Sequence, residues 1–128
     1  MLNKASAQYQ QVSTHSGIED ASPHRLIQML MEGVLQRLAQ AKGAIQRSAV
    51  NDRGEAIGKA ITIVGGLRDS LNKEVDGELA ANLDDLYDYI QRRLLAANIG
   101  SSEEIVDEVM TLMSTIKAGW DGIAEDVA

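Results

Sequence analysis

Several features are missing from this 128-residue sequence, and their absence excludes whole classes of protein. It has no cysteine, which excludes a disulfide framework and thiolate metal sites and fits a reducing compartment. Its apolar runs are shorter than the roughly 18 residues that a membrane-spanning helix needs. The segment that begins at Met1 is polar and lacks the apolar stretch of a signal peptide. We therefore expect a cytoplasmic protein that is not inserted in a membrane.

Catalytic and metal-binding patterns are absent as well. Neither His15 nor His24 has a glutamate three residues before it, which an inward-facing di-iron bundle requires. The sequence contains no glycine-rich phosphate loop and no nucleophile–base arrangement. Asp84, Asp85 and Asp88 could be paired carboxylates for acid–base chemistry, but the solvated face of a helix is the favoured interpretation. We expect no enzymatic activity, no metal and no cofactor.

The formal charge of −7 is unevenly distributed along the chain. Residues 23–48 hold four basic residues and one acid, a net charge of +3, whereas residues 101–128 hold seven acids and one lysine, a net charge of −6. If these segments are neighbours, the asymmetry favours their docking, although an exposed ion pair contributes only about 0–1 kcal/mol. No basic stripe follows the chain, so we expect no nucleic-acid binding.

What the sequence does contain is four segments with the three- and four-residue apolar spacing of amphipathic helices. The first begins at Ser22, a good N-cap, followed by Pro23, which suits the first helical position. A second is expected to open at Asp52, which with Glu55 resembles a capping box.

The third and fourth helices have their own boundary signals. Gly77 breaks the chain, and we expect a third helix over about residues 78–98, ended by Gly100. Ser101 with Glu104 resembles a capping box for a fourth helix that ends near residue 123.

Each helix has one continuous apolar face. The four faces consist of Ile27, Met31, Val34, Leu38, Ala41 and Ile45; Ile57, Ala60, Val64, Leu67 and Leu71; Leu83, Leu86, Tyr87, Ile90 and Leu94; and Ile105, Val109, Leu112, Met113, Ile116, Trp120 and Ile123. Long helices with short connections pack as antiparallel neighbours. The sequence therefore predicts an all-α fold, an antiparallel up-down four-helix bundle over residues 22–128, with a mobile N-terminal arm at residues 1–21.

Glycines inside the predicted helices are unusual, because each costs roughly 1 kcal/mol relative to alanine. They occur at Gly33, Gly58, Gly65, Gly66 and Gly119. Close approach of neighbouring helices is the favoured explanation. The alternative is that Gly58 and Gly65 leave shallow grooves for the helix of a partner.

Some large side chains are left over from the four faces. Tyr89 lies about 100° from the third face and Leu95 about 140° from it, at 100° per residue, so both are candidates for partner contact. Tyr87 and Trp120 lie on or near their faces and are expected in the core. His24 is expected to cap or pack at a helix start, and a phospho-acceptor in a phosphorelay bundle is the less favoured alternative.

The order and spacing of short motifs resemble those of the bacterial flagellar export chaperone FliS family over nearly the whole chain. The matching motifs are Ala21–Ile27; Lys59-Ala60 with Leu67 and Leu71; Gly77–Ala80 with Asn82-Leu83; Leu86–Tyr89 with Arg92–Leu94 and Ala97-Asn98; Glu108-Val109; and Ala118–Trp120. Tyr9, with Val12 and Thr14, resembles the leading arm of that family. One departure is Met31, where the family often has an aromatic residue.

The resemblance implies a bundle that binds the disordered C-terminal segment of flagellin in the cytosol. Binding would prevent premature polymerisation of flagellin and aid its export through the flagellar type III secretion apparatus, with a component of the export gate as a further partner. A helix that folds into a groove needs apolar flanks with small residues between them. The candidate client-binding residues are Tyr9, Ile61, Ile63, Tyr89, Leu95 and Met110. The alternative function is a non-catalytic four-helix adaptor that binds a folded partner.

Overall fold

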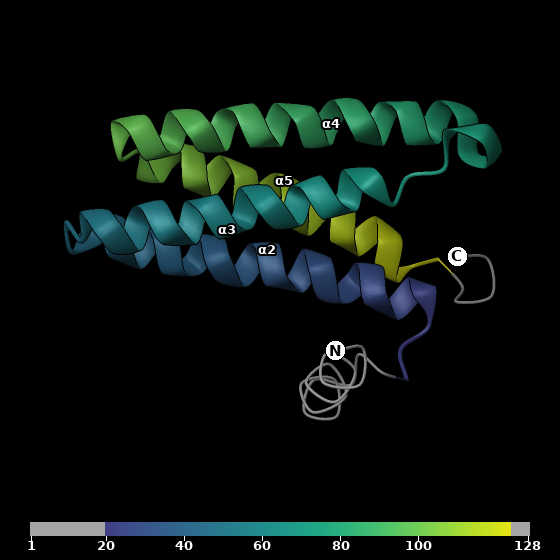
Figure 1. Ribbon diagram of the computed structural model, residues 1–128, viewed down its shortest axis with the longest axis horizontal. Coiled ribbons are helices and arrows are strands. Elements are labelled where there is room, and N and C mark those ends of the chain that lie inside the picture. The colour runs from purple at the N-terminus through teal and green to yellow at the C-terminus, as the bar shows by residue number, and fades with distance from the viewer. Residues whose placement is uncertain (1–19, 124–128) are drawn as a thin grey trace, which may run out of the picture.

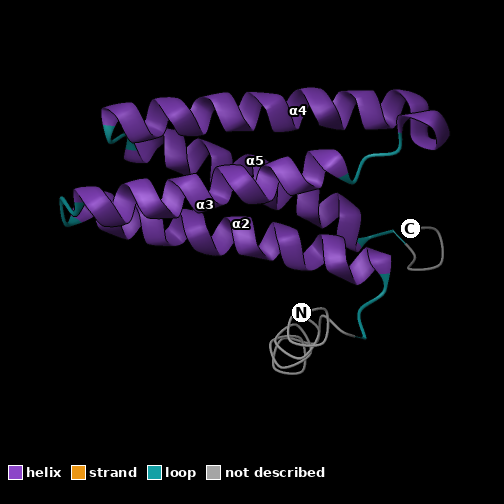
Figure 2. Cartoon of the chain, in the orientation of Figure 1, coloured by secondary structure: helices purple, strands orange, loops and turns teal. Residues whose placement is uncertain are grey.

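Four antiparallel helices form the computed structural model, which describes residues 20–123 (Figure 1). They are α2 (Pro23–Gln46), α3 (Val50–Asp69), α4 (Lys73–Gly100) and α5 (Glu103–Asp121). Each helix packs against the next one in sequence, and α5 closes the ring by packing on α2. The described part of the chain contains no strand (Figure 2). The predicted all-α four-helix fold is confirmed, whereas most of the predicted arm, with Tyr9, lies outside the described residues.

The predicted start of the first helix is confirmed, and that of the second is wrong. Ser22 Oγ accepts a hydrogen bond from the backbone N–H of Arg25 at 3.1 Å. Helix α3 begins earlier than predicted, at Val50, after a residue whose side chain makes no capping bond. Asp52 lies instead in the first turn, where its negative charge is favourable near the positive end of the helix dipole.

The predicted junction between the last two helices is displaced by one residue. Ser102, not Ser101, is the N-cap of α5, and its hydroxyl accepts a bond from the N–H of Ile105 at 3.2 Å. Ser101 has a left-handed backbone with φ 49°, and this conformation ends α4. Gly77, with φ 49° and ψ −112°, kinks α4 rather than preceding it, because Asn72 already caps the helix five residues earlier.

The four predicted faces meet in one core. Thirteen buried residues of this core lie on the predicted faces. Leu86, which was predicted on the third face, is instead 37% exposed. Leu86 lies on the α5 side of α4, because it stands two turns before Arg93, which bonds to Glu108 of α5. The prediction is wrong because the C-terminal half of α5 runs away from α4 towards α2 (Figure 1). Val106, which was not predicted, is fully buried. The buried face residues are Met31, Val34, Leu38, Ala41, Ile57, Ala60, Val64, Leu67, Tyr87, Ile90, Leu94, Val109 and Met113.

The charge asymmetry between the first and last helices is realised as contacts. Lys42 of α2 forms ion pairs with Asp107 at 2.8 Å and with Glu103 at 3.9 Å, both on α5. Gln28 donates a hydrogen bond to Asp121 at 2.8 Å, near the other end of the same helix pair. The two helices are therefore neighbours, as the docking argument required.

The helix glycines divide into two groups. A Cβ at Gly33 would lie 3.4 Å from Cδ1 of Ile63, and one at Gly65 would lie 3.4 Å from Nε2 of Gln91. These two glycines face side chains of the neighbouring helix, so the groove interpretation is wrong for Gly65. A Cβ at Gly58 would meet no atom within 4 Å, so open space remains there.

Candidate functional site

The candidate client-binding residues within the described range do not form a single patch. Ile63 faces α2, since it is the residue that a Cβ at Gly33 would contact. Met110 also lies on the α2 side, because it stands two turns before Lys117, which pairs with Glu32 of α2 at 3.9 Å. Both side chains are partly buried and pack against the core.

Ile61 and Tyr89 lie on opposite sides of α4. The backbone carbonyl of Ile61 accepts a hydrogen bond from Gln91 Nε2 at 3.1 Å, which places Ile61 between α3 and α4. The hydroxyl of Tyr89 donates to Glu108 Oε2 at 2.5 Å, which places Tyr89 between α4 and α5. Arg92 lies over the ring of Tyr89, with its guanidinium carbon 5.8 Å from the ring centroid. Tyr89 is therefore part of a polar contact between two helices, in addition to being partly exposed.

Leu95 is the most exposed of these residues, at 54%, and Ile99, one turn later, is 87% exposed. Their four-residue spacing puts both on the same side of α4, and we call this pair the outer face of α4. Sequence reasoning missed Ile99 because it lies off the predicted third face at the end of a helix. Its spacing from Leu95 was the signal that could have found it.

Helix α3 leaves space beside the outer face of α4. Helices α3 and α4 are antiparallel, and two contacts fix their alignment: a Cβ at Gly54 would lie 4.0 Å from Asn98, and Ile61 accepts a hydrogen bond from Gln91. Between these contacts, Gly58 of α3 lies level with Leu95 of α4. Gly58 is the glycine whose Cβ position is open. An apolar side chain from outside could therefore lie against Leu95 without meeting a side chain at position 58.

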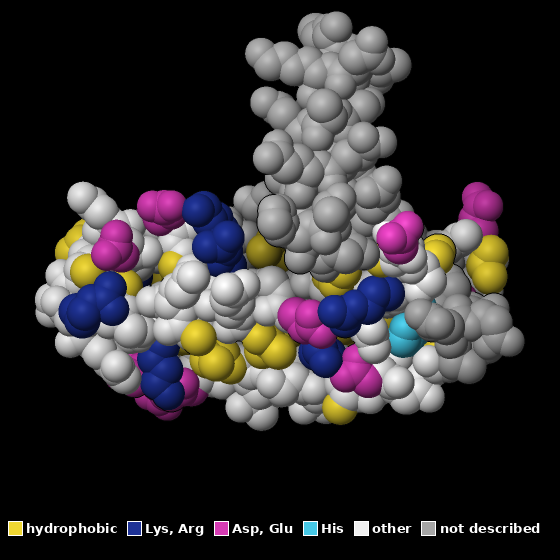
Figure 3. All heavy atoms as spheres, turned by 90° about the horizontal axis from the view of Figure 1, so that it is seen from below, with side chains coloured by type: hydrophobic (Ala, Val, Ile, Leu, Met, Phe, Trp, Pro, Cys, Tyr) yellow, Lys and Arg dark blue, Asp and Glu magenta, His cyan; other side chains and the backbone are white. Residues whose placement is uncertain are grey.

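Exposed apolar side chains are concentrated on α4. Within residues 20–123, five of the seven large hydrophobic residues that are exposed belong to this helix: Val75, Leu79, Leu86, Leu95 and Ile99. The opposite side of the molecule, seen in Figure 3, has patches of hydrophobic side chains separated by basic and acidic ones. Because folding normally buries such residues, α4 is the helix best supplied for contact with a partner.

Two charged clusters fix α4 against its neighbours. Arg68 of α3 pairs with Asp84 at 2.8 Å and Asp88 at 3.2 Å, and the hydrogen bond from Arg68, together with that from Lys73, holds the pKa of Asp84 below its ordinary value. Between α4 and α5, Glu108 accepts bonds from Tyr89 and, at 2.9 Å, from Arg93.

The hydrogen bond between Tyr89 and Glu108 shifts the pKa of both groups. The bond from Tyr89, followed by that from Arg93, lowers the pKa of Glu108, and the same bond raises the pKa of Tyr89. For Tyr87, burial alone raises the pKa to about 12, which fits its position in the core.

His24 packs at the start of α2, as the favoured interpretation predicted. It is 4% exposed and stacks on Trp120 of α5 with ring centroids 5.0 Å apart. Its Nε2 lies 2.9 Å from the carbonyl oxygen of Trp120, so that nitrogen carries a proton and donates it. This burial counts against the phosphorelay alternative, because a phospho-acceptor must be reached by a second protein.

The described part of the chain, residues 20–123, has neither a metal site nor a membrane-spanning helix. No group of three or more histidine, aspartate or glutamate residues there is arranged to hold a metal ion. No helix in that range is long and apolar enough to cross a membrane.

Comparison with protein families identifies the group to which this chain belongs. The family described as "Flagellar protein FliS" matches residues 5–127. The chain belongs to the FliS family. The flagellar secretion chaperone FliSB of Pseudomonas aeruginosa is 54% identical over 121 residues, covering 94% of this chain and 96% of that protein.

More distant FliS relatives match over a similar span. The flagellar secretion chaperone FliS of Salmonella typhimurium is 43% identical over 117 residues, covering 91% of this chain and 87% of that protein. The one from Vibrio cholerae is 40% identical over 115 residues, covering 90% of this chain and 85% of that protein. The resemblance found in the sequence motifs is thereby confirmed, and with it the assignment to a family of flagellar export chaperones.

Proposed function

We propose that this FliS-family chain binds the disordered C-terminal segment of flagellin in the cytosol. It thereby prevents premature polymerisation and delivers flagellin to the export gate of the flagellar type III secretion apparatus. The role is one of binding, without catalysis. The observation that carries the proposal is the outer face of α4, where Leu95 and Ile99 are exposed beside the open position at Gly58.

Burial of apolar surface supplies the driving force in this proposal. A disordered segment must offset the cost of ordering, and it does so by covering apolar side chains as it becomes helical. Complete burial of a leucine or isoleucine side chain contributes about 1.5–3 kcal/mol. Leu86, Leu95 and Ile99 are spread along the part of α4 beyond its kink at Gly77, which suits a long helical segment better than a compact epitope.

The client surface is proposed to include Leu95 with Ile61 on the α3 side of α4 and Tyr89 on the α5 side. Tyr9, outside the described residues, remains a further candidate. Ile63 and Met110 are weaker candidates, because both lie on the α2 side of their helices. Tyr89 would contribute its ring edge while its hydroxyl remains bonded to Glu108.

The decisive experiment is titration with an isolated C-terminal flagellin peptide. Circular dichroism should show that the peptide is largely unstructured alone and gains helix in the complex. Calorimetry should give a negative heat-capacity change, since apolar surface is buried. Leu95→Glu and Ile99→Glu should each weaken binding at least about tenfold, because each places a charge in an apolar contact.

The matched control is Val75→Glu, which makes the same kind of change at another highly exposed apolar residue of α4. It should change the affinity by less than about twofold, and all three variants should keep the wild-type melting temperature, since exposed positions rarely affect stability. A loss only in Val75→Glu would place the client at the other end of α4. Binding of folded flagellin but not of the peptide would favour the adaptor function instead.

A further inference from the structure

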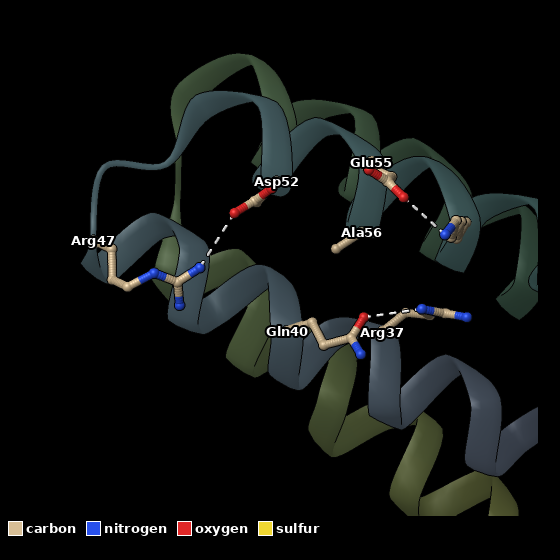
Figure 4. A pocket seen from close by; sticks show the side chains of 7 residues that line it. Arg37, Gln40, Arg47, Asp52, Glu55 and Ala56 are labelled. Atoms are coloured by element: carbon tan, nitrogen blue, oxygen red, sulfur yellow. Dashed lines mark hydrogen bonds and ion pairs between the residues drawn. The ribbon is translucent and has the colours of Figure 1, made fainter.

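A hollow of about 280 Å³ lies between α2 and α3, on the side of α3 away from α4 (Figure 4). Arg37 and Gln40 line it from α2, while Glu55, Ala56 and Lys59 line it from α3. Ala56 is buried and provides a small apolar floor between polar side chains. The hollow thus combines donors, acceptors and a methyl group on two helices that pack tightly together.

Arg37 is the cation of this hollow that forms no ion pair with a described residue. Within residues 20–123, every lysine and arginine forms an ion pair except Arg37 and Arg53. Arg53 is engaged by Asn98 and Ser101. Arg37 donates one hydrogen bond, from Nη1 to Gln40 Oε1 at 3.1 Å, and no other bond from its guanidinium is formed within the described range.

The remaining charges of the hollow are already paired. Lys59 contacts Glu55 at 2.9 Å, and Arg47 contacts Asp52 at 3.5 Å at the far end of the hollow. Three cations and two anions line the hollow, so one positive charge is in excess. Because Arg47 and Lys59 are paired, the excess charge is that of Arg37. The hydrogen bond from Lys59 is the main cause of the lowered pKa of Glu55, and the charge of Arg37 adds to it.

We propose that this hollow binds a carboxylate side chain from an acidic segment of a partner protein, with Arg37 as its main contact. The guanidinium offers a pair of parallel N–H donors, which matches the two oxygens of a carboxylate. The hydrogen bond to Gln40 orients this fork. The methyl group of Ala56 lies where the carbon chain of an aspartate or glutamate would pass.

The charges favour a carboxylate over a phosphate. One carboxylate neutralises the single excess positive charge, whereas a phosphate brings up to two negative charges next to Asp52 and Glu55. The chain as a whole has a formal charge of −7 and repels acidic partners except where positive charge is in excess. An acidic segment is therefore directed to this hollow, and the site is separate from the outer face of α4 proposed for flagellin.

The test uses a fluorescein-labelled hexaglutamate peptide and fluorescence polarisation at about 0.15 M salt, where repulsion by the net charge of the chain is largely screened. Wild-type protein should bind the peptide saturably, and a hexaglutamine peptide of equal length should not bind. Arg37→Gln should weaken binding about tenfold, which corresponds to the loss of one charge-assisted contact. Arg37→Lys should fall between the two, because it keeps the charge and loses the fork.

Two further variants serve as controls. Arg25→Gln removes the same charge from the same helix but outside the hollow, and it should change the affinity by less than about twofold. Glu55→Gln removes a repelling charge inside the hollow and should strengthen binding about threefold. Arg37→Gln should leave the affinity for the flagellin peptide unchanged, so the two proposals fail independently.

Three results would overturn the proposal. The first is an absence of saturable binding by the wild-type protein. The second is equal weakening by Arg25→Gln and Arg37→Gln, which would mean non-specific attraction to the basic residues of α2. The third is stronger competition by tripolyphosphate than by unlabelled hexaglutamate, which would show that the hollow prefers phosphate.

Discussion

Trp120 and His24 illustrate what single residues contribute to this bundle. The indole Nε1–H of Trp120 donates to the carbonyl oxygen of His24 at 3.0 Å, and His24 Nε2 donates back to the carbonyl oxygen of Trp120 at 2.9 Å. The two rings also stack. This reciprocal contact joins the first turn of α2 to the last turn of α5.

Removing the indole should weaken the whole fold. Trp120→Ala deletes a partly buried ring, for which a loss of about 3 kcal/mol is expected, equivalent to roughly 10 °C or more in melting temperature for a domain of this size. Trp120→Phe keeps the stacked ring and loses the hydrogen bond, so it should lie between wild type and Trp120→Ala. Thermal unfolding followed by circular dichroism measures both. A shift of only a degree or two in the alanine variant would contradict the structural role of Trp120.

The sequence predicted half of this contact. Apolar spacing placed Trp120 on the fourth face, and its position beside a proline placed His24 at a helix start. The pairing joins residues 96 positions apart, and it depends on how two helices meet in space. The spacing of apolar residues along one helix carries no information about which residues of another helix lie beside it.

At the scale of the helix, α4 is held to α5 by a polar cluster as well as by apolar contacts. Glu108 receives the hydroxyl of Tyr89 and the guanidinium of Arg93. Its pKa in the folded protein lies below the ordinary value of 4.5, with the bond from Tyr89 as the largest cause. The ionised form is therefore the one that stabilises this helix pair.

This cluster should make stability depend on pH in a defined direction. Because the folded pKa of Glu108 is lowered, its contribution is present above about pH 4.5 and is lost as the pH falls through the folded pKa. Wild-type protein should therefore exceed Glu108→Gln in urea midpoint at pH 7, and the difference should shrink at pH 3. Other carboxyl groups titrate in both proteins and cancel. A difference that stays constant from pH 7 to pH 3 would show that the charge of Glu108 is not involved.

The helices could be predicted because their signals are local. Their exact starts and the exposure of their side chains were harder to predict. The first N-cap was predicted correctly. Helix α3 begins at Val50 after Ala49, whose side chain cannot cap a helix, so no residue type there signals the start. Leu86 was predicted on the third apolar face and Leu95 off it. Both are exposed, because exposure depends on where α5 and α3 lie relative to α4.

For the whole molecule, the arrangement of the helices could be predicted more fully than its binding surfaces. Short connections required antiparallel neighbours, and the opposite charges of the first and last helices anticipated the pairs that Lys42 makes with Asp107 and Glu103. The hollow beside Arg37 was not predicted, since its lining is assembled from two helices and the turn between them.

The contact between His24 and Trp120 has a consequence for chain connectivity. The start of α2 lies beside the end of α5 (Figure 1). The four helices can therefore pack in the same ring when the chain begins at a different helix. A circular permutant that links residue 123 to residue 22 through a short glycine–serine linker should fold when the chain is opened at the peptide bond between Ser70 and Leu71. Its helical content and melting temperature should remain close to those of residues 20–123, because the new ends lie in a short connection outside the helices, between exposed Ser70 and partly buried Leu71. A permutant that is monomeric but lacks cooperative unfolding would show that the connection between α3 and α4 sets the arrangement of the helices.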